Sequence, residues 1–361
     1  MVLTEKTYSI ADDVRFFFTD SGAPPDSKGY TTLVAIHGLG FTGAIFEKLQ
    51  SQAQTHNLRI VALNRRDYPG STPFSDVELE DLKSGDEARA RRVFDSAGLH
   101  IALFLRKLIE EEGIPLPSEE AGRRGGIAVM GWSLGALTAM LPFAVPKSVL
   151  GEATYGLLER YVRGLIILDP PYSALGYPDP SYIKVEKMYN AFTDPTANGL
   201  EGVWDKFVHL ASSRYQYDTV RDGVPITESI EKTGLLSRTD QCLADSWSRE
   251  ELERLSTAGA IVRGDFAMHG CTGILNKITR QVLVAPESRA ATFFPRLSIT
   301  YLYATQSIWT TIVGYIETRK LYQEHKETIR TINFVELKGS DHFVHYNNPE
   351  YFLKITKEIL T

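Results

Sequence analysis

The sequence predicts an α/β fold: a doubly wound, mostly parallel eight-stranded sheet with an inserted, mainly helical lid. Three observations support this prediction. Short β-branched apolar runs end at Gly, Asn or Asp, as buried parallel strands do when helices cover both faces of a sheet. Longer amphipathic or loop-rich segments separate these runs, so that strand and helix alternate along the chain. One long interval lacks such runs and interrupts the alternation.

The individual elements can be placed along the chain. Residues 6–10 and 14–18 alternate between apolar and polar side chains and predict an antiparallel hairpin at one edge of the sheet. Residues 97–111 carry apolar side chains at helical spacing, and another helix begins at Leu134, directly after a strand. The apolar runs that predict the parallel strands are residues 33–36, 59–63, 127–130, 165–168, 299–303 and 332–337.

The interval from residue 170 to residue 289, termed the insertion, is rich in Pro, Tyr and Trp. We expect it to cover the carboxyl edge of the sheet as a lid, with residues 1–169 and 290–361 forming the core. Most of its large side chains must pack within the insertion, so roughly a third at most are expected to face a substrate. The candidates are Tyr172, Tyr177, Tyr182, Tyr189, Phe192, Trp204, Phe207, Trp247, Phe266 and Met268.

The composition argues against several classes of partner. The 45 acidic side chains outnumber the 39 basic ones and give a net charge of -6, which argues against a nucleic-acid-binding surface. The tightest basic cluster, residues 89–92, lies among acidic residues and is expected on a solvated helix face. No apolar run approaches the length of a membrane span, and the first residues do not resemble a secretory signal. We therefore expect a cytoplasmic protein with no membrane partner.

The cysteines and histidines do not predict a metal site. Cys242 and Cys271 are the only cysteines, too few for a disulfide framework and without metal-ligand spacing. His269 lies close to Cys271 in the sequence, but no sharp glycine turn surrounds the cysteine, so this pair is not favoured as a catalytic pair. The sequence leaves the oligomeric state open, a homodimer included.

Residues 131–135, Gly-Trp-Ser-Leu-Gly, fit the pattern G-x-S-x-G, in which a serine occupies a sharp turn between a strand and a helix. An apolar strand precedes the pattern and a helix follows it, as the motif requires. The glycines would allow close approach to neighbouring backbone, and the helix N-terminus would favour a developing anion. Ser133 is therefore a candidate nucleophile. The alternative is that Ser133 only caps the helix.

Together with three further segments, this motif makes the chain resemble the α/β-hydrolase superfamily over nearly all of its length outside the insertion. Residues 37–40, His-Gly-Leu-Gly, resemble the H-G-x-G oxyanion loop of that family. The resemblance implies that the backbone N–H groups of Leu39 and Leu134 hold the oxyanion, and that His37 is mainly a structural residue of the loop. Residues 64–71 resemble the family's turn D-x-R-G-x-G-x-S, which implies an architectural role.

The third segment, residues 339–343, resembles the family's G-x-x-H loop after the last strand. The resemblance implies that His342 is the base that takes the proton of Ser133, because the family's chain order is nucleophile, acid, histidine. His345 follows three residues later and is the alternative base.

The acid that orients the base is not at its usual place in the chain. Most family members carry Asp after the strand that here comprises residues 299–303, yet no carboxylate follows that strand before Glu317. A variation in the superfamily places the acid after the preceding strand, where Asp169 stands, and implies that it holds the Nδ1–H of the histidine. Asp341 and Glu317 are the less suitable candidates. Asp169 could also simply end its strand and cap the next turn.

These residues imply an enzyme that cleaves an ester-type bond of a small apolar or aromatic substrate through an acyl-enzyme, without metal or cofactor. His37, Trp132, Tyr172 and His345 are further residues expected near the substrate. A serine at the turn argues against the epoxide hydrolases and haloalkane dehalogenases of the superfamily, which use Asp there. A lactonase, thioesterase or carbon–carbon bond hydrolase would share these residues with an esterase. A lyase or cyclase, and a non-catalytic ligand-binding member, are the alternatives from other classes.

Overall fold

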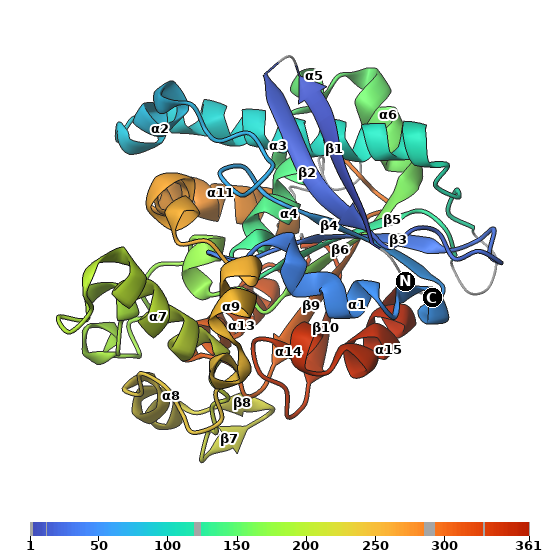
Figure 1. Cartoon of the computed structure of the whole chain (residues 1–361). Helices are drawn as coiled ribbons and strands as arrows, with labels where there is room; N and C mark the ends of the chain where they lie inside the picture. The colour runs from blue at the N-terminus through green and yellow to red at the C-terminus, as the bar shows by residue number, and fades with distance from the viewer. Residues whose placement is uncertain (1–2, 12, 119–123, 285–292, 328, 361) are drawn as a thin grey trace.

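The computed structural model describes residues 3–11, 13–118, 124–284, 293–327 and 329–360. Within these residues, eight strands form the central sheet. The strands are β1 (Thr4–Ala11), β2 (Val14–Asp20), β3 (Thr31–Ile36), β4 (Leu58–Leu63), β5 (Ile127–Trp132), β6 (Val162–Leu168), β9 (Ser298–Ala304) and β10 (Ile332–Leu337). Their order in the sheet is β1-β2-β4-β3-β5-β6-β9-β10 (Figure 1). The β1–β2 hairpin forms one edge, β2 runs antiparallel to β4, and all other neighbouring strands are parallel. The predicted doubly wound, mostly parallel sheet is confirmed.

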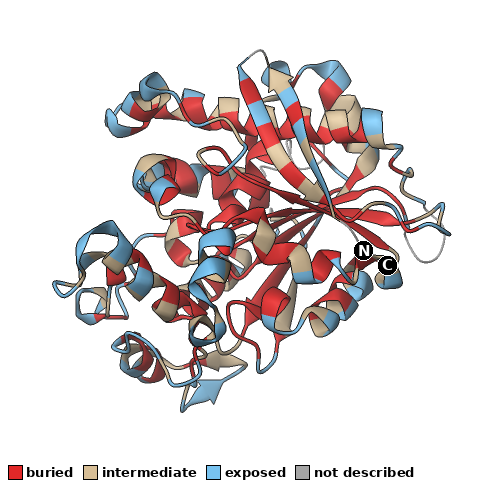
Figure 2. Ribbon diagram, in the orientation of Figure 1, coloured by how far each residue is buried: buried red, intermediate tan, exposed pale blue. Residues whose placement is uncertain are grey.

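The parallel strands are largely apolar because helices cover both faces of the sheet. Every residue of β3, β4 and β5 is buried. Alternate side chains enter two separate hydrophobic clusters: in β3, Val34 and Ile36 belong to one cluster and Leu33 to the other. Figure 2 shows the resulting band of buried residues through the sheet, with exposed residues on the outer faces of the helices.

Helices from both halves of the core form the two outer layers. One layer contains α2 (Asp76–Lys83), α3 (Glu87–Glu112), α4 (Gly135–Ala144), α5 (Lys147–Leu150), α6 (Glu152–Tyr161) and α13 (Trp309–Glu324). The other contains α1 (Glu47–Gln50), α14 (Val344–Asn347) and α15 (Pro349–Leu360). The helix predicted over residues 97–111 begins earlier, at Glu87, because the Asp86 side chain caps it by accepting two backbone N–H groups. The basic cluster at residues 89–92 lies on its first turns.

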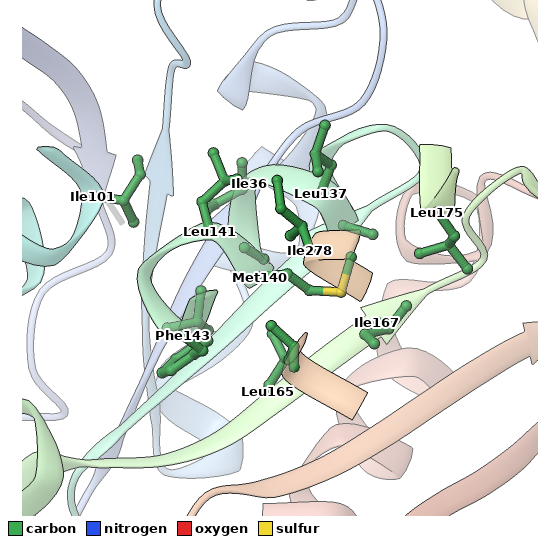
Figure 3. Packing of buried hydrophobic residues seen from close by; sticks show 14 of the residues in the cluster. Ile36, Ile101, Leu137, Met140, Leu141, Phe143, Leu165, Ile167, Leu175 and Ile278 are labelled. Carbon is green, nitrogen blue, oxygen red and sulfur yellow. The ribbon is translucent and has the colours of Figure 1, made fainter. Parts of the chain in front are cut away.

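The insertion consists mainly of short helices beside the carboxyl edge of the sheet (Figure 1). Its α-helices are α7 (Gly199–Ser212), α8 (Thr227–Gly234), α9 (Arg249–Leu255), α10 (Phe266–His269) and α11 (Thr272–Leu283), and a small hairpin is formed by β7 (Val220–Arg221) and β8 (Val224–Pro225). The last of these helices packs against the core: Figure 3 shows Ile278 of α11 close to Leu137 and Leu141 of α4. The predicted boundary at residue 289 lies outside the described residues.

The sequence predicts no membrane-spanning segment. Within the part of the chain that the structure describes, every helix is too short or too polar to cross a bilayer.

Candidate active site

Ser133 occupies the sharp turn between β5 and α4. Its backbone is left-handed, with φ of 55°, and its N–H donates to the carbonyl of Leu168 on β6 at 2.9 Å. A Cβ on Gly131 would lie 2.3 Å from the carbonyl oxygen of Gly135, and a Cβ on Gly135 would lie 2.4 Å from that of His37. Both positions therefore require glycine. The N-cap residue of α4 is Leu134, and no side chain caps this helix, so the serine is not its cap.

The loop of residues 37–40 follows β3 and passes directly over this serine. A Cβ on Gly38 would lie 2.9 Å from Ser133 Cβ and 3.3 Å from its Oγ, so a larger residue would crowd the turn. Leu39, Ser133 and Leu134 line the same cavity. The backbone N–H groups of Leu39 and Leu134 donate to no backbone carbonyl among the described residues. Both donors are therefore free to bind an anion at the serine.

His342 lies in the loop after β10 and is hydrogen-bonded to Asp169, the residue that follows β6. The distance from His342 Nδ1 to Asp169 Oδ2 is 2.6 Å. The carboxylate is fully buried and also accepts the Ser307 hydroxyl at 2.5 Å and the backbone N–H of Ala304 at 3.2 Å. These groups meet because β6, β9 and β10 are neighbouring parallel strands whose carboxyl ends share one edge of the sheet.

The other two carboxylates considered for the acid have different partners. Asp341 accepts the side-chain amide of Asn347 at 2.8 Å, and Glu317 on α13 accepts a tyrosine hydroxyl of the insertion at 2.8 Å. Among the described residues, neither is hydrogen-bonded to the His342 ring, which bonds Asp169 alone. The geometry therefore favours Asp169 among the three.

A cavity of about 370 Å³ opens beside Ser133 and His342, and both residues line it. This size suits a small organic molecule. Among the described contacts, the serine and the histidine are not hydrogen-bonded to each other. The wall is mainly apolar and comes largely from the insertion and α13; it includes Val185, Met188, Leu210, Ala211, Ile308 and Trp309.

Half of the aromatic and methionine residues proposed from the insertion line this cavity, which is more than the expected third. They are Tyr172, Tyr189, Phe192, Phe207 and Phe266. The remaining five pack elsewhere: Tyr177, Tyr182, Trp204, Trp247 and Met268 do not line the cavity. The insertion also contains short 3-10 turns, and the cavity-lining residues Tyr172 and Phe192 lie in two of them.

Three of the residues expected near the substrate do not line the cavity. His37 is buried, with Nδ1 facing a loop carbonyl at 3.0 Å and Nε2 accepting the backbone N–H of Arg65 at 3.0 Å. Trp132 donates from Nε1 to the carbonyl of His342 at 2.9 Å and so supports the histidine loop. His345 is the third. All three support the loops of the site from behind.

His345 lies against Trp132 with ring centroids 4.5 Å apart. Neither of its ring nitrogens has a hydrogen-bond partner among the described residues. Burial, reinforced by the nearby His342, holds the pKa of His345 well below the usual 6.5. The ring is therefore neutral at physiological pH and serves as a packing group.

Several residues of the site were not predicted from the sequence, among them Ser307, Trp309 and His269. Ser307 stands after β9, where the family's acid is usually found, and instead bonds the carboxylate of Asp169. Trp309 and His269 line the cavity. Cys271 directs its thiol to backbone carbonyls at 3.4 Å, so it forms no pair with His269. The one sequence feature that could have indicated the role of Ser307 is that its hydroxyl stands in the usual place of the acid.

A possible metal site lies apart from this cavity. His209, Cys242 and Asp245 are the one group of three potential ligands in the described ranges. None of them lines the cavity, and Asp245 is also paired with Arg238. The group is therefore separate from the candidate active site.

The strand order, the serine turn and the histidine after the last strand together define an α/β-hydrolase. The model of the alpha/beta hydrolase family matches residues 33–355, and the chain belongs to that family. Membership supports a hydrolase as the class of activity. No curated protein matches the chain.

Solved structures with the same fold cover nearly the whole chain. An esterase from Exiguobacterium antarcticum is 12% identical with a TM-score of 0.52, and potato (Solanum tuberosum) epoxide hydrolase I is 16% identical with a TM-score of 0.51. A bromoperoxidase from Bacillus anthracis is 12% identical with a TM-score of 0.51. Each comparison covers 99% of both chains. At these identities the likeness shows the fold alone.

Proposed function

We propose that the protein is a serine hydrolase that cleaves an ester-type bond, in a carboxylic ester or lactone, of a small apolar or aromatic substrate. Ser133 is the nucleophile, His342 the base and Asp169 the acid that orients it. The backbone N–H groups of Leu39 and Leu134 form the oxyanion hole. The observation that carries the proposal is the 2.6 Å bond from His342 Nδ1 to Asp169 Oδ2 beside a cavity that Ser133 also lines.

The order of events follows from this arrangement. Because Asp169 accepts the Nδ1–H of His342, the Nε2 atom keeps its lone pair and can take the proton of Ser133. Ser133 Oγ then attacks the carbonyl carbon, and the two backbone N–H groups stabilise the negative oxygen. The histidine returns the proton to the leaving alcohol. It next removes a proton from water, which attacks the acyl-enzyme and releases the acid.

The lining supports the substrate class. Apolar and aromatic side chains dominate the wall, so an apolar acyl or alcohol group would gain from burial there. Both tyrosines of the lining already have hydrogen-bond partners: Tyr172 donates to Asp179 at 2.7 Å and Tyr189 to Asp194 at 2.8 Å. A serine in place of the Asp that epoxide hydrolases carry argues for acyl transfer.

The first test is covalent labelling with a fluorophosphonate, which phosphonylates an activated serine. We expect stoichiometric labelling of the wild type, with the adduct mapped to Ser133 by mass spectrometry. The Ser133→Ala variant should show no labelling and should lose hydrolysis of p-nitrophenyl esters by about 10⁶-fold. Ser298→Ala, which removes an exposed hydroxyl on β9, is the matched control and should be labelled like the wild type. An intact, folded wild type that is not labelled would refute the proposal.

A further inference from the structure

A buried ion pair joins the insertion to the turn after β4. Arg65 donates from Nη1 to Oδ1 of Asp265 at 2.6 Å and from Nη2 to Oδ2 at 3.0 Å. Tyr68 donates its hydroxyl proton to the same carboxylate at 2.5 Å. All three residues are buried. Asp265 lies in the insertion, 200 residues along the chain from Arg65.

The same network ends on the loop of residues 37–40. Nη2 of Arg65 donates to the carbonyl oxygen of Gly38 at 2.9 Å, and the N–H of Gly40 donates to the Tyr68 hydroxyl at 2.7 Å. The Gly38 carbonyl and the Leu39 N–H belong to one trans peptide group and point in opposite directions. The guanidinium that holds the carbonyl therefore aims the Leu39 N–H the other way.

Backbone hydrogen bonds also join the insertion to the end of the loop of residues 37–40 and to Thr42. The N–H of Thr257 donates to the carbonyl of Gly40 at 2.7 Å, and the N–H of Thr42 donates to the carbonyl of Leu255 at 2.8 Å. A Cβ on Gly40 would lie 2.3 Å from the ring of Trp204 on α7. The loop is thus enclosed between the core and the insertion.

Charge and burial fix the ionisation states of Arg65 and Tyr68 in this network. Burial acts to lower the pKa of Arg65, but the Asp265 carboxylate more than offsets it, so that this pKa lies above its usual value. Burial and the same carboxylate raise the pKa of Tyr68 well above 10.0. The guanidinium therefore stays charged and the phenol stays protonated at physiological pH. Because a buried charge without its partner is unfavourable, the three side chains hold one another in place.

We propose that Asp265, Arg65 and Tyr68 are positioning residues for the oxyanion hole, so that the insertion sets the geometry of the reaction as well as covering it. This inference rests on the proposed function, because it concerns the donor that stabilises the oxyanion in that reaction. The role is indirect: none of the three lines the cavity.

The chain offers a matched control far from the site. Tyr8 on β1 is also buried and donates to a carboxylate, Glu112, at 2.6 Å. Glu112 in turn pairs with the buried Arg59 at 2.6 Å. Tyr8→Phe therefore removes the same kind of bond from the same kind of network, without a connection to the loop of residues 37–40.

The test compares the second-order rate of fluorophosphonate labelling and the KM and kcat for a p-nitrophenyl ester. We expect Tyr68→Phe to label at least tenfold more slowly and to lose kcat by a similar factor, with KM within about twofold, because a displaced oxyanion donor weakens the transition state. Tyr8→Phe should stay within twofold of wild type on both measures. Thermal denaturation should show a similar loss of Tm in both variants.

Two further results decide the proposal. Asp265→Asn, which leaves every residue of the loop unchanged, should also lower kcat and the labelling rate more than KM. Equal labelling rates for Tyr68→Phe and Tyr8→Phe, with Ser133 still labelled, would overturn the positioning role and leave the proposed function intact. Absence of labelling in the wild type would instead overturn the proposed function itself.

Discussion

Asp169 has a backbone conformation and an environment that few residues could satisfy together. Its φ of 49° is left-handed, a region that Asn and Asp adopt more readily than other non-glycine residues. Its carboxylate is fully buried and accepts three hydrogen bonds, from His342, Ser307 and Ala304. The residue is therefore fixed both by its main chain and by its side chain, which gives the histidine ring one orientation.

Substitution of this residue separates the possible acids. Asp169→Asn keeps the left-handed backbone but presents an amide that favours the wrong histidine tautomer, so we expect kcat/KM for a p-nitrophenyl ester to fall by roughly 10⁴-fold. Asp341→Asn, beside the same histidine, should stay within about tenfold of wild type because its carboxylate bonds Asn347. A larger loss of kcat/KM in Asp341→Asn than in Asp169→Asn would show that Asp169 is not the acid.

The turn between β5 and α4 depends on close contact between backbones. Gly135 lies against the carbonyl oxygens at the end of β3, and Gly131 lies against the first turn of α4. Side chains at either position would separate the helix from the sheet. The two glycines therefore set how near the serine comes to the loop of residues 37–40.

A pair of alanine substitutions tests this requirement. In Gly135→Ala the new Cβ would lie 2.4 Å from two carbonyl oxygens, and we expect the free energy of unfolding to fall by about 3 kcal/mol or more. Gly156→Ala, in the middle of α6, meets nothing within 4 Å and should raise it by up to about 1 kcal/mol. Urea denaturation measures both. Similar stability in the two variants would show that the turn tolerates a Cβ.

A polar cluster at the hairpin edge links four elements of the whole molecule. Arg59 on β4 pairs with Asp20 on β2 and with Glu112 at the end of α3, and Glu112 also accepts Tyr8 and Lys6 of β1. Burial acts to raise the pKa of Glu112, but these hydrogen bonds lower it from 4.5 to about 2. The carboxylate therefore prefers to be charged in the folded protein more than in the unfolded chain.

The stability of the whole molecule should depend on pH through this group. A depressed folded-state pKa contributes stability that is present above pH 4.5 and is lost as the pH falls toward 2. We expect Glu112→Gln to be less stable than wild type at pH 7 and the difference to shrink between pH 4.5 and 2, as measured by urea denaturation. Glu5→Gln, at an exposed position of β1, is the control. A difference that is constant over this range would contradict the assignment.

Local patterns predict much of the fold and part of the site. The apolar runs identify the strands because parallel strands must be buried on both faces, and the motifs around Ser133 and His342 lie within a few residues of sequence. The hairpin at Asp222 and Gly223 also had a local signal, since both have positive φ and an Asp-Gly pair favours such a turn. Its strands are only two residues long, which is too short for an alternating apolar pattern to mark them.

Contacts between distant residues explain what the sequence could not show. Arg65 and Asp265 are 200 residues apart, and no spacing rule relates two charged residues at that separation. Asp169 was reached only through a family resemblance, because Asp after a strand is equally common as a turn residue. The packing of α11 on α4 likewise depends on the three-dimensional path of the insertion.

The place of His342 beyond the last strand also has a consequence for the order of synthesis. The serine turn, the loop of residues 37–40 and Asp169 all leave the ribosome before the insertion, which itself precedes β9 and β10. Because domains form as their residues emerge from the N-terminal end, a nascent chain can assemble most of the sheet while it still lacks the proposed base. Under the proposed function, the growing polypeptide would therefore be unable to acylate Ser133 until β10 and the histidine loop have been added.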